Sequence, residues 1–310
     1  PSNSSAASDV YKRQMDSLLR HGPSWSRDIS LVVADEIHLV GLDERGPTLE
    51  ILVTRLMDEL PNPQILALSA TISNSVEIAR WINARVVSIN WRPVPLREGV
   101  FYRYKIYFSD GSKEIIRKFT RNPKIDLALD EILRGGQSII FTGTRNEAVR
   151  TAVKIASAIR ENLELYGLMN KSELKKVSDR ILVEGERTQL SETLAEQVKA
   201  GVAFHHAGLS AGHRRIIEDA FRKGLIKALT ATPTLAAGVN LPSRRVVITY
   251  SSRRSMGFYE PLTIFEYKQM AGRAGRPKYD EYGEAVLIAK NEDQLEYFSE
   301  TYINGEPERI

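Results

Sequence analysis

Two adjacent carboxylates and a histidine, Asp35, Glu36 and His38, follow directly after an apolar run that starts at Ile29. The run is rich in β-branched residues, which predicts a buried strand. Open α/β sheets bind ligands at the carboxyl ends of parallel strands, and a hydrated cation there would stabilise both acids. In a nucleotide hydrolase the first acid holds Mg²⁺ and the second orients the attacking water. The alternative is a strand that ends in a polar loop.

A second stretch suited to chemistry is 269–277, where Arg273 and Arg276 lie beside Gly272 and Gly275. Guanidinium is permanently charged and binds phosphate oxygens through paired hydrogen bonds, which suits stabilisation of a transferring phosphoryl group. The glycines allow the backbone to approach a ligand closely. A solvent-exposed basic turn explains the same residues equally well.

The segment 230–242 follows a predicted strand that ends at Leu229, and it contains several hydroxyl side chains and Gly238. Such a segment can hold phosphates through its backbone N–H groups. A tight loop without a ligand is the alternative, and these residues alone leave the choice open.

The composition indicates a globular protein of about two domains, since the chain has 310 residues of which 42% are hydrophobic. The 43 basic and 39 acidic residues give a net charge of +4, which permits a nucleic-acid partner without requiring one. The chain has no cysteine, so disulfides and thiolate metal sites are excluded. It has no signal-peptide core and no apolar run of roughly 20 residues, so we expect a soluble, cytoplasmic protein with no membrane partner.

Strands and helices must position these side chains, and the first part of the chain predicts both in alternation. Residues 1–14 lack periodicity and predict a disordered or non-native tail. The following pattern predicts a strand from 29, a helix after 47, a strand at 64–68, a helix at 75–81 opened by a capping box of Asn74 and Glu77, and a strand at 85–89. The helix after residue 47 has an apolar face formed by Leu49, Leu52, Val53, Leu56 and Leu60. Such alternation favours a parallel sheet covered by helices.

Pro93 and Pro95 interrupt this pattern and place a domain boundary near residue 92, because neither suits a helix or a central strand. We expect domains at 15–92 and 93–290, with 291–310 starting a connection to a further domain. The second domain predicts strands at 101–108, 114–116, 138–141, 202–204, 226–229, 246–250 and 285–289, and helices at 125–133, 148–159 and 293–302. Residues 162–200 predict a solvated helical connection. The predicted fold class is therefore α/β.

The chemical stretches occur in a recognisable order. The sequence contains in turn Asp35-Glu36-Ile37-His38, Ser69-Ala70-Thr71, Thr142-Gly143-Thr144-Arg145, His205-His206-Ala207-Gly208-Leu209, 232–242 and 269–276. In this order they resemble motifs II through VI of superfamily 2 DExH-box helicases over nearly the whole chain. The double histidine and the run 236–242 are similar to the Ski-type branch. The segments 91–96 and 305–310 are similar to its archaeal Hjm/HelQ-type DNA-repair members.

The resemblance implies two RecA-like domains and a role in ATP hydrolysis for several residues. Asp35 would coordinate Mg²⁺ and Glu36 would also contact the metal and polarise the hydrolytic water. His38 would pass the nucleotide state to Ser69 and Thr71. Further ATP contacts are implied for Gly238, Asn240, Gln269, Arg273 and Arg276. The two arginines would reach the γ-phosphate from the second domain, so that domain closure gates hydrolysis.

The resemblance also implies contacts with the nucleic-acid backbone, at Thr144, Arg145, His205, His206 and Thr232. The segment 250–261 occupies the place of a strand-separating β-hairpin, with contacts from Arg253, Arg254, Phe258 and Tyr259. An aromatic side chain that stacks on the last base pair would contribute roughly 1–3 kcal/mol. An ordinary surface hairpin is the alternative.

One expected motif is missing, since the sequence contains no G-x-x-x-x-G-K-[ST], the loop and lysine that cradle nucleotide phosphates. We interpret the chain as a fragment with the back half of a first RecA-like domain and a complete second one, without the family's C-terminal domains. We expect the fragment alone to lack ATPase activity. A non-catalytic nucleic-acid-binding module is the alternative for the fragment.

The resemblance implies a parent enzyme that uses ATP and Mg²⁺ as a 3′ to 5′ DNA helicase. It would act as a monomer on single-stranded and forked DNA, in the repair of stalled forks. An RNA helicase of the same branch is the alternative, because polarity and DNA preference follow from the resemblance alone. Contacts with the 2′-hydroxyl would separate the two polymers.

Overall fold

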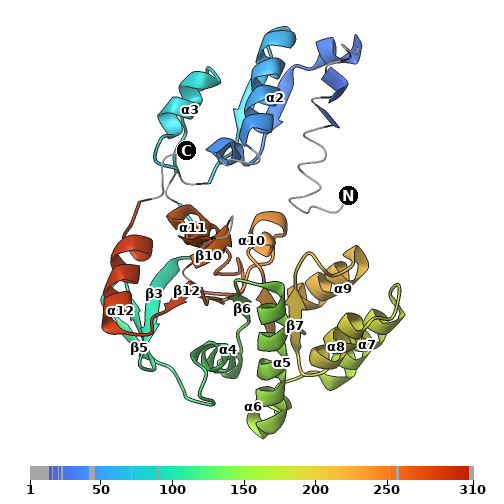
Figure 1. The fold of residues 1–310 in the computed structure, drawn as a ribbon, viewed down its shortest axis with the longest axis vertical. Helices are drawn as coiled ribbons and strands as arrows, with labels where there is room; N and C mark the ends of the chain where they lie inside the picture. The colour runs from blue at the N-terminus through green and yellow to red at the C-terminus, as the bar shows by residue number, and fades with distance from the viewer. Residues whose placement is uncertain are drawn as a thin grey trace. The chain divides into compact units, whose positions relative to one another are not determined.

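The computed structural model describes residues 14–15, 17–19, 21, 24–41, 46–70, 72–89, 91–250, 252–255 and 258–306. The chain divides into two compact units, residues 1–91 with 306–310 and residues 92–305 (Figure 1). The division falls at Trp91, directly before the segment with Pro93 and Pro95. Each unit is described by itself below.

The first unit pairs two short parallel strands with a long helix. Its elements are η1 (Ser24–Asp28), β1 (Leu31–Ala34), η2 (Ile37–Gly41), α2 (Gly46–Glu59), β2 (Gln64–Ala67) and α3 (Ser75–Trp81). The register of β1 and β2 places Leu31 opposite Gln64. The predicted apolar face of α2 is confirmed, because Leu49, Leu52, Val53 and Leu56 are buried with the following Leu60.

The strand β1 is half exposed, so the prediction of a buried strand was wrong. Leu31 and Val33 are 50% and 53% exposed, and Leu66 of β2 is 48% exposed on the same face. The alternate residues Val32 and Ala34 pack into the apolar clusters with α2. Because side chains alternate between the two faces of a strand, the described residues cover only one face of this sheet.

Two further predictions for the first unit were wrong. Residues 84–89 form no strand, and Val87 is 83% exposed. A capping box is also absent at α3, where Asn74 is the N-cap but its side chain accepts no backbone hydrogen bond. Its amide instead donates to Glu77 Oε2 at 3.4 Å. The residue types were right for a helix start, but they did not determine which side-chain atoms meet.

The second unit is built on an eight-stranded sheet in the order β5-β4-β3-β12-β9-β6-β8-β7. Its strands are β3 (Leu96–Tyr102), β4 (Lys105–Phe108), β5 (Lys113–Ile115), β6 (Ser138–Phe141), β7 (Val202–His205), β8 (Ala228–Ala231), β9 (Arg245–Ile248) and β12 (Gly283–Ile288). From β3 to β7 all neighbours are parallel, whereas β4 is antiparallel to both β3 and β5. The predicted α/β class with a mostly parallel sheet is confirmed.

The helices of the second unit lie on both faces of this sheet. They are α4 (Pro123–Leu133), α5 (Arg145–Glu161), α6 (Leu163–Gly167), α7 (Lys171–Val183), α8 (Gln189–Val198), α9 (Ala211–Arg222), α10 (Thr234–Gly238), α11 (Ile264–Ala271), α12 (Glu292–Phe298) and the π-helix η3 (Ser299–Ile303). Figure 1 shows α4 and α5 on one side and α10, α11 and α12 on the other. Covered on both faces, β6, β7, β8 and β9 are buried along their whole length.

The charged segment 162–200 belongs to the core, so the prediction of a solvated connection was wrong. Its helices α7 and α8 bury Leu174, Ile181, Leu194 and Val198 in the main apolar cluster. The apolar residues recur at helical spacing among the charges, which leaves one stripe free to pack.

The predicted strand at 101–108 is instead a hairpin. The strands β3 and β4 pair in antiparallel fashion, with Tyr102 opposite Lys105. Arg103 and Tyr104 form the connection with φ of 48° and 61°. Two left-handed residues are typical of a type I′ turn, which usually contains Asn or Gly. Because neither is present here, the sequence carried no signal for the turn.

The hairpin predicted between 250 and 261 is confirmed in its backbone, since β10 (Ser252–Ser255) pairs in antiparallel fashion with β11 (Phe258–Pro261). Its turn and the side chains of Arg253, Arg254, Phe258 and Tyr259 lie outside the described part of the structure. Among the described helices, none has the length and apolar character needed to cross a bilayer.

Candidate nucleotide and nucleic-acid sites

The two acids that follow β1 stand in a tight turn. The Asp35 side chain is exposed, and its Oδ1 accepts a hydrogen bond from the Glu36 backbone N–H at 2.9 Å. Glu36 has φ of 55°, a backbone conformation that residues other than glycine rarely adopt. Strain of this kind clusters at functional sites, and here it holds both carboxylates at the carboxyl end of the strand.

A buried histidine connects these acids to the segment after β2. His38 is 1% exposed, and its Nδ1 accepts a hydrogen bond from the Ala70 backbone N–H at 3.1 Å. Its Nε2 lies 3.1 Å from Glu36 Oε2. Since Nδ1 accepts, the proton of a neutral ring resides on Nε2 and is donated to Glu36. Ser69 Oγ lies 3.4 Å from Nδ1, so the structure brings together His38 and Ser69, while Thr71 lies outside the described residues.

The donor set at Asp35 fits Mg²⁺ bound together with phosphates, because such sites use one or two carboxylates and retain water. One Asp35 oxygen accepts from the backbone, and the other has no hydrogen-bond partner among the described residues. The Glu36 carboxylate faces His38. Within the described residues there is no group of three or more potential metal ligands, so a cage made of protein alone is absent there.

In the second unit, the Arg276 guanidinium is bound by Asp280 of its own loop and by the distant Gln137. Its Nη2 contacts Asp280 Oδ1 at 2.7 Å, its Nε contacts Oδ2 at 2.8 Å, and its Nη1 donates to Gln137. Gln137 directly precedes β6, so Arg276 lies at the amino end of the sheet. Arg273 donates to the backbone oxygen of Ala236 in α10.

The glycine of this loop serves close packing within the chain. Gly275 has φ of 92°, and a Cβ there would lie 2.7 Å from a Val94 methyl carbon and 3.4 Å from Gly283 Cα. Arg92 donates to the backbone oxygens of Gly272 and Ala274 at 3.1 and 2.6 Å. The close approach at Gly275 is therefore to the segment 92–95 and to β12 of the same chain, and an approach of this loop to a ligand stays a prediction. Sequence reasoning missed Arg92 as the residue that anchors this loop.

A groove opens at the opposite, carboxyl end of the sheet. Its volume is about 460 Å³, and its lining consists of Gly143, Thr144, Arg145, Ala207, Thr232, Pro233, Thr234, Tyr250 and Glu266. These residues follow β6, β7, β8 and β9 or start α11. Three residues predicted to contact nucleic acid, Thr144, Arg145 and Thr232, are thus brought together.

Local hydrogen bonds explain how two of these residues are held. Thr144 is the N-cap of α5, where its Oγ1 accepts from the Glu147 N–H at 3.2 Å. Thr232 Oγ1 lies 2.9 Å from Thr234 Oγ1. Arg145 is exposed and has no carboxylate within ion-pair distance among the described residues. The groove therefore offers hydroxyls and a free cation, which suit phosphate oxygens.

The double histidine is buried behind this groove and is not part of its lining. His205 Nε2 lies 3.0 Å from Glu218 Oε1 of α9. His206 is 3% exposed, its Nδ1 accepts from the Gly208 N–H at 3.1 Å, and its Nε2 has no hydrogen-bond partner in the described part of the chain. Burial, with smaller effects from Arg145 and His205, lowers the pKa of His206 and favours its neutral form.

The remaining residues assigned to ATP are spread over three places. Gly238 ends α10, Asn240 is exposed in the following loop, and Gln269 lies half buried on α11. None of them lines the groove at the carboxyl end of the sheet. In this unit, the residues assigned to ATP are therefore separate from the residues that line the groove assigned to nucleic acid.

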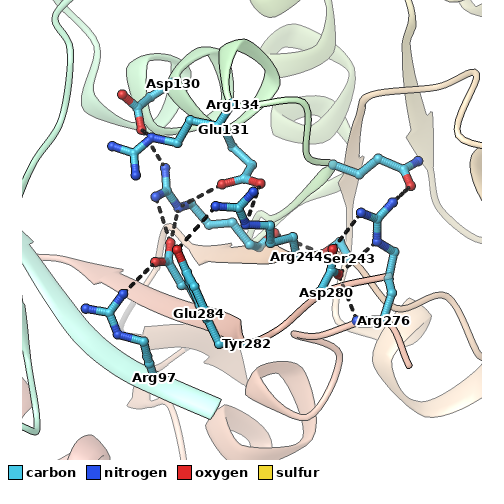
Figure 2. A network of polar contacts seen from close by, with 12 residues as sticks. Arg97, Asp130, Glu131, Arg134, Ser243, Arg244, Arg276, Asp280, Tyr282 and Glu284 are labelled. Atoms are coloured by element: carbon cyan, nitrogen blue, oxygen red, sulfur yellow. Dashed lines mark hydrogen bonds and ion pairs between the residues drawn. The ribbon is translucent and has the colours of Figure 1, made fainter. Parts of the chain in front are cut away.

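A buried charge network at the amino end of the sheet was missed by sequence reasoning (Figure 2). Arg245 opens β9, is fully buried, and contacts Glu284 at 2.7 Å, Glu114 at 3.0 Å and Asp130 at 3.1 Å. Glu131 is also fully buried and lies 3.4 Å from Arg244 Nε and 3.7 Å from Arg245 Nε. Burial, opposed by these arginines, raises the pKa of Glu131 to about 7. The basic pair before an apolar strand was its only sequence signal.

Comparison with known proteins identifies two helicase domains in this chain. Residues 9–79 match the DEAD/DEAH box helicase domain, and residues 165–278 match the helicase conserved C-terminal domain. Both domains are RecA-like.

Similar proteins include several archaeal helicases. The chain is 47% identical over 296 residues to the ATP-dependent DNA helicase Hel308 of Methanocella arvoryzae, which covers 95% of this chain and 39% of that protein. It is 44% identical over 302 residues to Hel308 of Pyrobaculum calidifontis, covering 97% and 42%, and 43% identical over 297 residues to Hel308 of Pyrococcus horikoshii, covering 96% and 39%. The chain thus spans about two fifths of the length of these relatives. The resemblance to superfamily 2 helicases is confirmed, and the chain is a homologue of the archaeal Hel308 proteins.

Proposed function

We propose that this chain is the ATP-coupled part of a DNA helicase, in which hydrolysis drives movement along single-stranded DNA. The observation that carries the proposal is the buried bridge through His38, because hydrogen bonds on both ring nitrogens link a candidate catalytic acid to the segment after β2. The names of the relatives favour DNA over the RNA alternative. In this proposal residues 15–92 belong to one RecA-like domain, residues 93–290 form a second, and residues 291–310 start the connection to a further domain.

On the nucleotide side, Asp35 holds Mg²⁺ and Glu36 orients the attacking water. Bound Mg²⁺ supplies positive charge that neutralises the phosphates. Neutral His38 donates to Glu36, so the orientation of that carboxylate depends on the backbone at Ala70. A shift of the Ser69–Thr71 segment would therefore change the position of the catalytic acid.

Arg273 and Arg276 stabilise charge on the γ-phosphate in this proposal, with Gly238, Asn240 and Gln269 as further nucleotide contacts. For Arg276 this role requires that phosphate oxygens replace Asp280 and Gln137, which bind its guanidinium in the free chain. Anchoring of the loop backbone by Arg92 limits the movement to the side chain.

On the nucleic-acid side, Thr144, Arg145 and Thr232 bind phosphates of one strand within the groove. Contacts of this kind carry no sequence information, as a translocating enzyme requires. Contacts from His205 and His206 stay predictions that need a conformational change, and those from the β10–β11 hairpin stay predictions as well. We extend the proposal to an intracellular monomer that moves 3′ to 5′ on forked DNA.

The decisive experiment is Glu36→Gln in the full-length protein. Loss of the catalytic acid should lower DNA-stimulated ATP hydrolysis by about 10²- to 10⁴-fold, while ATP-dependent DNA binding persists. Glu50→Gln, at an exposed position of α2, is the matched control. Turnover that survives Glu36→Gln would contradict the proposed role.

The 310-residue chain by itself should hydrolyse little or no ATP, since it contains no phosphate-loop lysine. Hydrolysis by this chain at the rate of the full-length protein would overturn that expectation. Unwinding of 3′-tailed and 5′-tailed duplexes of DNA and RNA by the full-length protein then tests polarity and substrate. Faster unwinding of 3′-tailed DNA is expected.

A further inference from the structure

The positive charge of this protein is concentrated in one short segment. Residues 102–124 contain seven basic and two acidic residues, a net charge of +5, whereas the whole chain carries +4. The rest of the chain is therefore slightly acidic. The segment comprises β4, β5 and the loop that leads into α4.

Most of these basic side chains face solvent. The exposed members are Arg103, Lys105, Lys113, Arg117, Lys118 and Arg121, which we call the basic surface. Lys105, Lys118 and Arg121 have no carboxylate within ion-pair distance among the described residues. Arg103 pairs with Glu292 at 3.5 Å and Arg117 with Glu164 at 3.3 Å, but more than half of each of these side chains is exposed. Solvent weakens such pairs, so both arginines are accessible to another anion.

Aromatic rings lie beneath several of these cations. Lys118 Nζ is 5.2 Å from the centre of the Tyr104 ring, Lys113 Nζ is 5.1 Å from that of Tyr107, and the Arg117 guanidinium is 5.1 Å from that of Phe119. Cation–π contacts hold the long side chains in place. Interleaved cations and aromatic rings are typical of surfaces that bind single-stranded nucleic acid.

The basic surface is connected to the groove by an ion pair and a helix cap. Lys124, at the end of the basic loop, pairs with Glu147 Oε1 of α5 at 2.7 Å, and the Glu147 N–H is capped by Thr144 of the groove. The Arg103–Tyr104 turn follows the carboxyl end of β3, which runs parallel to the strands that end at the groove. With strands about 4.8 Å apart, the row of strand ends from β6 to β5 extends roughly 24 Å.

Charged side chains also protect the exposed edges of sheets, and β5 is an edge strand. This explanation covers Lys113, which lies on β5. It does not cover Lys118 and Arg121, which lie in the loop beyond the strand, or Lys105, which opens β4. The charge is therefore placed along the strand ends as well as along the edge.

We propose that the basic surface binds the phosphate backbone of the nucleic-acid strand that leaves the groove, and so lengthens its path across the second unit. This inference rests on the proposed function, which puts a strand in the groove. The cations of this surface would bind the phosphates and make no base-specific contacts.

The test compares two oligothymidines, of about 6 and about 16 nucleotides, within the range of site sizes for single-strand binders. The variant Lys105→Gln with Lys118→Gln and Arg121→Gln removes three charges that lack ion pairs. Lys175→Gln with Arg180→Gln and Lys223→Gln removes the same charge from exposed positions on α7 and after α9. Affinity is measured for the 310-residue chain by fluorescence anisotropy as a function of salt.

The variant of the basic surface should bind the long strand more weakly and the short strand as before. For the long strand, the slope of log K against the logarithm of the salt concentration should become less steep by about 2. Three phosphate contacts are lost, and each contact on a single strand contributes about 0.7 to this slope. Equal affinity of variant and parent for the long strand, or an equal loss with the control variant, overturns the inference. If the unsubstituted chain binds neither strand, the proposed function fails instead.

Discussion

The two ends of the large sheet differ in whether their charged side chains are buried and paired or exposed. At the amino end, Arg245 is fully buried and contacts Glu114, Asp130 and Glu284 within 3.1 Å. At the carboxyl end, Arg145 is exposed with no carboxylate within ion-pair distance among the described residues. One arginine has its partners inside the protein, and the other presents its charge to solvent.

The difference separates stability from binding. A buried charge is tolerated only when other charges and hydrogen bonds compensate its desolvation, so the network around Arg245 must be complete before any ligand arrives. A binding site instead needs polar groups whose partners are missing until the ligand supplies them. Substitutions in the buried charge network at the amino end should therefore change unfolding, and those in the groove at the carboxyl end should change binding.

The largest effect is expected for Arg245→Ala. Removal of this side chain leaves several buried carboxylates without their cation, which costs about 3–5 kcal/mol. Urea unfolding measures the loss. Arg215→Ala, at an exposed position of α9, is the control and should change stability little. A loss for Arg245→Ala below that of the control would contradict the view that the amino end is held by these ion pairs.

Gly275→Ala should follow, with a loss of roughly 2–4 kcal/mol from left-handed backbone strain and overpacking together. The new Cβ would meet Val94 at 2.7 Å. Gly111→Ala is the matched control, because its φ of 80° is also left-handed but no atom lies within 4 Å of its Cβ. Thermal unfolding of both variants separates the two effects, and equal losses would exclude a packing role for Gly275.

The buried Glu131 should make stability depend on pH. Its folded-state pKa is raised by burial from 4.5 to about 7, so the protonated form favours the folded state. The stabilisation from protonated Glu131 is complete below about pH 4.5 and is lost as the pH rises through about 7. Stability should fall by roughly 2–3 kcal/mol from pH 5 to pH 8.

Glu131→Gln, which mimics the neutral acid, should flatten this dependence in urea unfolding across the same window. Glu186→Gln, at an exposed site, should leave the parent's dependence intact. A parent whose stability rises over this window would show that Glu131 is ionised in the folded protein.

The smallest effect concerns the carboxyl end. Arg145→Gln should weaken binding of single-stranded DNA roughly 5- to 10-fold and reduce the salt slope by about one phosphate contact. Stability should stay unchanged, since Arg145 is exposed. Arg150→Gln, also exposed on α5, controls for the loss of charge in an anisotropy titration. If Arg145→Gln destabilised the fold without affecting binding, the comparison between the two ends would fail.

Much of this protein followed from local sequence patterns. The apolar face of α2, the strands β6 to β9 and the alternation of strands and helices were predicted, because hydrophobic periodicity follows directly from residue type. The order of the motifs identified the helicase family, since six short stretches in one order are more specific than any one of them.

Tertiary structure decided which atoms meet. The sequence paired Arg273 with Arg276, but only the fold placed Arg276 against Asp280 and Gln137. It also predicted that the glycines of this loop allow close approach of the backbone, but only the fold placed Gly275 against Val94, which is 181 positions earlier in the chain. The charge of Arg245 is balanced by acids from three separate segments, β5, α4 and β12. Such contacts join residues distant in sequence, and desolvation at each depends on all its neighbours, so neither can be read from residue types and spacing alone.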